Sequence, residues 1–143
     1  MLAGDYLTYE VKSKQSGGSP HCRCCPSNPS IPSPSETISH IIASCVTYSD
    51  IRNRIVQEYR NICSLSKSGI QFENIYSNSE QFCQFVLDPA SFNLSQRVHI
   101  NDPILNDLFK LSRDLCFGIN SIRQRILKEK ENQHACGVVV VCV

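Results

Sequence analysis

The clearest hydrophobic pattern lies in the last third of the chain. Seven apolar residues recur there at steps of three and four: Ile104, Leu108, Leu111, Leu115, Ile119, Ile122 and Ile126. This spacing places them on one face of an amphipathic helix. Asp102 is a suitable N-cap, and Pro103 suits the first helical turn. The sequence therefore predicts a long helix from Pro103 to about Glu131.

Two shorter helices are predicted in the middle of the chain. Five residues form one apolar stripe at helical spacing: Tyr48, Ile51, Ile55, Tyr59 and Ile62. This stripe predicts a helix from about Ser49 to Ser64. Ser77 followed by Glu80 is typical of a capped helix start. A short apolar helix through Phe82 and Phe85 should follow and end at Asp88-Pro89.

The N-terminal third has less regular patterning. Residues 26–34 read PSNPSIPSP and predict a loop. Ser33 as N-cap, Pro34 at the first helical position and Glu36 three residues after the cap form a capping box. They predict a first helix from about Pro34 to Ser44.

Composition narrows the class of protein. The chain has 143 residues and a formal net charge of +1, with 41% hydrophobic residues. The first fifty residues hold few large apolar side chains, and so small a segment usually needs a metal or disulfides to fold. No apolar run approaches the ~20 residues that span a bilayer, and no signal peptide is visible at the start. We therefore expect an intracellular protein, in nucleus or cytoplasm, with no membrane partner.

Cysteine spacing identifies the candidate chemistry. Nine cysteines are present, and in a reducing compartment such a cluster favours metal binding over disulfides. Cys22, Cys25, His40 and Cys45 form the pattern C-x2-C-x14-H-x4-C. Three thiolates and one imidazole form a closed tetrahedral set for one structural Zn²⁺. Positions five apart on an α-helix differ by about 140° in direction, so the first helix should end near Ser44 for Cys45 to face the ion.

Two alternatives to this ligand set remain open at this stage. Cys24 lies between two of the proposed ligands and could replace either Cys22 or Cys25 in a C-x-C register. The thiols could also be unrelated, with His40 an ordinary surface residue.

The remaining cysteines and histidines have ordinary interpretations. Cys63, Cys83 and Cys116 occupy apolar helical neighbourhoods and are expected in the core. Cys136 and Cys142 could be exposed, reactive thiols in the tail, and His99 and His134 are expected at the surface. No thiol, base and orienting group form a recognisable set, so neither an enzyme nor a small-molecule substrate is predicted.

These elements predict a mainly α fold in three parts. Residues 1–47 would form a zinc-stapled knuckle with the first helix. Residues 48–131 would form a helical region containing the long C-terminal amphipathic helix. Residues 132–143, which include VVVVCV, would form an irregular tail.

The stretch CRCC…SETISHIIASC resembles the C-terminal zinc-binding (CCHC) region of non-LTR (LINE-like) retrotransposon reverse transcriptase polyproteins. That pattern is C-x2-C, a variable loop, then E-T-x-x-H-x-x-x-x-C, which Glu36, Thr37, His40 and Cys45 match. The resemblance covers nearly all of residues 1–131, more loosely beyond the zinc motif. Two departures are a longer, proline-rich loop and the additional Cys24.

The resemblance implies zinc-dependent binding of RNA or DNA. It makes four basic residues of the last helix candidates for phosphate contact: Arg113, Arg123, Arg125 and Lys128. The Tyr-x-Asp-Asp turn of these polymerases is absent, since the nearest string is YSDI at residues 48–51. The expected protein is therefore not an enzyme. A zinc-scaffolded protein-interaction module and a non-functional retroelement remnant are the alternatives.

Overall fold

The computed structural model describes residues 21–26, 30, 34–65, 69–91 and 102–141, with the side chains of the last helix described from residue 103 to residue 133. Most of this part of the chain is helical, which confirms the predicted mainly α fold. The named elements are η1 (His40–Ser44), η2 (Val46–Tyr48), α2 (Ser49–Leu65), α3 (Phe72–Tyr76), α4 (Ser79–Leu87) and α6 (Asp102–Val141). The predictions for Ser33, His99 and Cys142 and for the side chains of Asp102, His134 and Cys136 lie outside the described residues.

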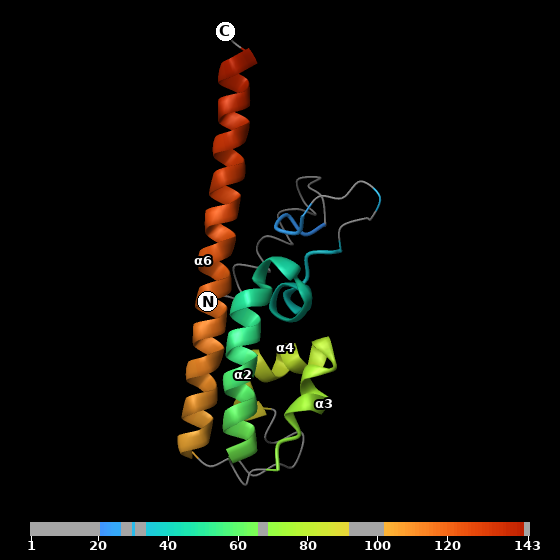
Figure 1. Cartoon of the computed structure of the whole chain (residues 1–143), viewed down its shortest axis with the longest axis vertical. Coiled ribbons are helices and arrows are strands. Elements are labelled where there is room, and N and C mark those ends of the chain that lie inside the picture. The colour runs from blue at the N-terminus through green and yellow to red at the C-terminus, as the bar shows by residue number, and fades with distance from the viewer. Residues whose placement is uncertain (1–20, 27–29, 31–33, 66–68, 92–101, 142–143) are drawn as a thin grey trace.

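Helices α2 and α6 form the main packing unit. They lie side by side and run in opposite directions, with η1 at the end where α2 begins (Figure 1). The Tyr59 hydroxyl and the Ser112 hydroxyl are joined by a buried 2.7 Å hydrogen bond between the two helices. Gly118 allows a close approach, because a Cβ there would lie 1.7 Å from Cδ1 of Ile51. The apolar stripes predicted for both helices thus face each other.

Helices α3 and α4 pack aromatic rings against α2. Tyr59 makes edge contacts with Phe82 and Phe85 and stacks on Phe72. The N-cap of α4 is Asn78, one residue after the predicted cap Ser77, because the side chain of Asn78 accepts the backbone N–H of Gln81 at 3.1 Å. Its end at Leu87, before Asp88, is confirmed.

The predicted capping box before the first helix is wrong. The Pro34 carbonyl accepts the backbone N–H of Cys22 at 2.8 Å, and Ser35 forms an isolated antiparallel bridge with His21. This extended backbone delays the helical turns to residues 38–44. The actual cap is Thr37, whose hydroxyl accepts the His40 backbone N–H at 3.0 Å. Glu36 is therefore available for a different, buried interaction.

The last helix is longer than its apolar stripe predicts. It continues from Asp102 to Val141, past Glu131, and extends beyond the other described elements (Figure 1). Residues 132–141 are therefore helical rather than irregular. Adding a residue to an existing helix avoids the cost of nucleation, and no proline interrupts this segment. None of the described helices is long and apolar enough to cross a membrane.

One core joins the N-terminal segment to the helices. Cys22, Cys24 and Cys45 belong to the same buried cluster as Tyr48 and Leu115. Helix η1 contacts α2, α4 and α6. The segment that carries the cysteines is thus packed directly against the helical region.

Candidate metal centre

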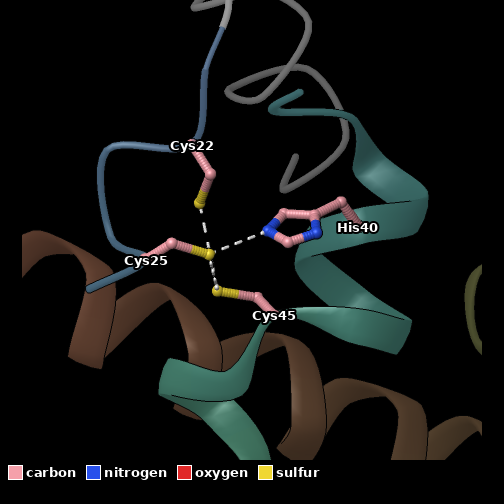
Figure 2. A group of neighbouring side chains, drawn as sticks. All are labelled: Cys22, Cys25, His40 and Cys45. Atoms are coloured by element: carbon pink, nitrogen blue, oxygen red, sulfur yellow. Dashed lines mark hydrogen bonds between the residues drawn. The ribbon is translucent and has the colours of Figure 1, made fainter. Parts of the chain in front are cut away.

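Four side chains converge between the N-terminal loop and η1. The ligand atoms of Cys22, Cys25, His40 and Cys45 all lie within 4.8 Å of one another (Figure 2). Cys25 Sγ lies 3.3 Å from His40 Nε2 and 3.6 Å from Cys45 Sγ. Cys22 Sγ lies 3.9 Å from Cys45 Sγ. The group could hold a metal ion, and no other Cys, His, Asp and Glu group of this kind occurs among the described side chains.

These distances fit a tetrahedral ion with soft ligands. Metal–ligand bonds of about 2.3 Å to sulfur and 2.0 Å to nitrogen give tetrahedral edges of about 3.8 Å between sulfurs and 3.5 Å between sulfur and nitrogen. The sulfur–sulfur contacts of 3.6 and 3.9 Å and the sulfur–nitrogen contact of 3.3 Å are close to these edges. All three thiols are free rather than joined in a disulfide.

The loop with the first two cysteines is held by backbone contacts. The Cys22 backbone N–H donates to Pro34, and the Thr47 hydroxyl donates to the Cys24 carbonyl at 2.5 Å. Residues 23–25 form a bend between these contacts. As a result, Cys22 and Cys25 point toward the same space from one turn (Figure 2).

His40 and Cys45 are brought together by a widened helical turn. The prediction that the first helix ends near Ser44 is confirmed, because Cys45 is extended with ψ 123°. Residues 40–44 form a π turn, in which the Cys45 backbone N–H donates to the His40 carbonyl at 2.7 Å. In a π turn, residues five apart are joined by a hydrogen bond, and their side chains point in more similar directions than they would in an α-helix. The π turn that brings the two side chains together was not predicted from the sequence.

Arg52 is a buried residue beside the centre that sequence reasoning missed. Its Nε donates to the Ile42 carbonyl at 2.8 Å, and its Nη2 donates to the Cys45 carbonyl at 2.7 Å. The side chain thereby satisfies carbonyls at the end of η1, where the helix leaves acceptors unpaired. The only sequence signal for this role is the position of Arg52, one turn into the helix that follows the candidate ligand Cys45.

The thiols of the centre do not ionise equally. Hydrogen bonding to Cys45 and burial raise the pKa of Cys22 to about 12. The same contact lowers the pKa of Cys45, and burial raises the pKa of Cys25. A bound cation would favour ionisation of all three thiols.

Cys24 points away from the four ligand atoms. It is buried, and its Sγ lies 3.9 Å from Nη1 of Arg123. Arg123 also forms a buried ion pair with Glu36. Although burial opposes its charged form, the hydrogen bond and charge of Glu36 leave the pKa of the Arg123 guanidinium raised. The structure therefore favours Cys25 over Cys24 in the ligand group.

Arg123 is the wrong choice as a phosphate contact. Its side chain is only 4% exposed and is paired with Glu36, because its position on α6 faces the N-terminal segment. The other three candidates, Arg113, Arg125 and Lys128, are exposed. Arg125 and Lys128 line a groove together with Arg23 from the cysteine loop. Lys130 donates a hydrogen bond to the Arg23 carbonyl and fixes the loop to the helix.

The three cysteines predicted in the helical core are there. Cys63, Cys83 and Cys116 are each 7% exposed. Burial raises the pKa of each thiol to about 11. They remain protonated at neutral pH and act as small apolar side chains.

Comparisons of this chain with protein-family models, with curated proteins and with solved structures each give no match. Its site must therefore be interpreted from its own residues.

Proposed function

We propose that Cys22, Cys25, His40 and Cys45 bind one structural Zn²⁺. The supporting observation is the convergence of four soft or borderline ligand atoms within 4.8 Å, at spacings close to tetrahedral edges. A set of four protein ligands leaves no position for a reacting water, so the ion would stabilise the fold. It would join the cysteine loop to η1, which packs on α2, α4 and α6.

We further propose that this stabilised module binds RNA or DNA through phosphates. The groove between the cysteine loop and α6 places Arg23, Arg125 and Lys128 around one concave surface. Glu131 lies at its edge and is the one acidic residue in its lining. Clustered cations bind nucleic acid by releasing counterions from phosphates. The resemblance of the motif to retroelement reverse transcriptases favours the same partner.

A second basic position on α6 is flanked by aromatic rings. Phe109, Arg113 and Phe117 follow at steps of four, and all three side chains are exposed. Arg113 and Lys128 are fifteen residues apart, or about 22 Å along the helix. Bases can stack on exposed rings while the backbone contacts cations, an arrangement typical of single-strand binding. We propose that a single strand runs along α6 from the groove toward Phe109.

The phosphate proposal is tested by titrating zinc-loaded protein with fluorescent single-stranded RNA and DNA over a salt series. Arg125→Glu with Lys128→Glu should abolish most binding at ~50 mM salt, where phosphate contacts are strongest. Arg54→Glu, an exposed residue of α2, makes the same kind of charge change outside the groove and should bind more tightly than the double variant. Absence of binding by the wild-type protein would refute the proposal.

A further inference from the structure

Arg52 is a buried cation with no acidic partner among the described side chains. It is 5% exposed. The ion pairs in the described part of the chain are Arg60–Glu73 and Arg123–Glu36, and neither includes it. Its hydrogen-bond partners are the backbone carbonyls of Ile41, Ile42 and Cys45. A charge removed from water normally requires a compensating charge.

The proposed metal centre has the charge that Arg52 lacks. Three thiolates contribute three negative charges, a divalent cation contributes two positive charges, and a neutral histidine contributes none. The sum is one negative charge on the occupied centre. Glu36 and Arg123 neutralise each other and add nothing to this balance. Arg52 contributes one positive charge and contacts the backbone of the ligand Cys45 at 2.7 Å.

We infer that Arg52 is the counter-charge of the metal centre and the positioning residue of its Cys45 ligand. This inference rests on the proposed metal binding. The guanidinium stabilises the anionic occupied centre, and its hydrogen bonds hold the end of η1 where Cys45 leaves the helix. Arg52 and the occupied centre thus stabilise each other.

The charge and the hydrogen bonds can be separated with two substitutions. Arg52→Gln removes the charge and keeps a donor, whereas Arg52→Lys keeps the charge and loses the planar fork. Arg54→Gln, on the same helix but exposed, is the matched control. Zinc affinity is measured by competition with a chromophoric chelator. Arg52→Gln should weaken it by roughly 10- to 100-fold, as changes to outer-shell partners do. Arg52→Lys should weaken it less, and Arg54→Gln should leave it unchanged.

Cobalt substitution gives a readout that a purely structural role would not change. A nearby positive charge lowers the energy of thiolate electrons, so its removal should move the thiolate-to-cobalt charge-transfer band to longer wavelength. We expect this shift in Arg52→Gln but not in Arg52→Lys or Arg54→Gln. Equal affinities and spectra in Arg52→Gln and Arg52→Lys would overturn the inference.

The outcomes separate this inference from the proposed metal centre. If the wild-type protein binds neither zinc nor cobalt, the metal centre itself is refuted. If it binds both and Arg52→Gln binds equally well, only the role of Arg52 is refuted. Should Arg52→Gln fail to fold with excess zinc while Arg52→Lys folds, the need for the charge is supported. If neither variant folds, Arg52 acts through its hydrogen bonds alone. The inference that it balances the charge of the metal centre would then be overturned.

Discussion

Glu36 and Arg123 form a buried ion pair between the segment that follows the cysteine loop and helix α6, although 87 residues separate them in sequence. Each residue is 4% exposed. Glu36 lies just before η1, which begins with the candidate ligand His40, and Arg123 lies on the long C-terminal helix. The pair therefore links the segment between the cysteine loop and η1 directly to helix α6.

Removing one partner of this pair should strongly destabilise the fold. Arg123→Met leaves the Glu36 carboxylate buried without compensation and should lower the free energy of unfolding by about 3–5 kcal/mol. The double variant Glu36→Leu with Arg123→Met should recover much of that loss, because neither charge remains. Urea unfolding of zinc-loaded protein measures both.

The Arg60–Glu73 pair is the control for that experiment, since both of its side chains are substantially exposed. Arg60→Met should cost less than about 1 kcal/mol. A loss of this small size for Arg123→Met would show that the buried pair does not connect the two parts of the fold.

Serine substitutions should separate the ligands from their neighbour in the loop. Cys25→Ser should abolish tight zinc binding, because a thiolate is lost from a set of four. Cys24→Ser should retain it, because the Cys24 side chain points toward Arg123. The measurement is zinc stoichiometry after gel filtration with a weak chelator. Retention of zinc by Cys25→Ser and its loss from Cys24→Ser would instead support the C-x-C register.

Stability should fall in alkaline solution because of the three core thiols. Their pKa values are raised from 9.0 to about 11 in the folded protein. Below pH 9 both states keep these protons, so this contribution to stability is fully present. Between pH 9 and 11 the unfolded chain releases protons that the folded protein retains, and stability decreases.

The loss should reach up to about 2 kcal/mol for each of the three thiols by pH 11, since each pKa is raised by about two units and one unit corresponds to about 1.4 kcal/mol. Urea midpoints of zinc-loaded protein from pH 7 to 11 provide the test. The variant with Cys63, Cys83 and Cys116 all changed to alanine should show a flatter profile. An equally steep profile in that variant would assign the alkaline loss to other groups.

The salt dependence of nucleic-acid binding should report the number of phosphate contacts. Lys128→Ala should weaken binding similarly across sequences and reduce the slope of log affinity against log salt by about 1. Phe117→Ala should instead cost about 1–3 kcal/mol of binding energy with the slope nearly unchanged, because stacking involves no counterion release. A reduced slope in Phe117→Ala would contradict the proposed stacking role.

Local patterning predicted the helices well where one apolar stripe decides the structure. The stripe from Tyr48 to Ile62 correctly predicted α2. The grouping of Cys22, Cys25, His40 and Cys45 was predicted from spacing, because a metal site needs a fixed number and type of donors. Long-range contacts were not predictable in this way. Glu36 fits a capping box in the sequence. In the structure it is buried instead, because the backbone at Pro34 is extended and the Glu36 carboxylate pairs with Arg123, 87 residues away.

Arg123 shows the same limit from the other side. Its charge suggested a surface role, and nothing local indicates that it faces Glu36 rather than solvent. Arg52 likewise belongs to a helix whose apolar stripe was recognised, but its carbonyl partners depend on the π turn that ends η1. Sequence periodicity identifies the buried face of a helix without identifying what a charge on that face contacts.

We propose that Cys22, Cys25, His40 and Cys45 hold one metal ion that stabilises the fold. Native mass spectrometry of reduced protein, with and without a chelator, tests it most directly when combined with circular dichroism of the same samples. We expect one zinc per chain, lost with the chelator or in Cys45→Ala, together with a marked loss of helicity. A folded protein that carries no metal and keeps its helicity in the chelator would contradict the account.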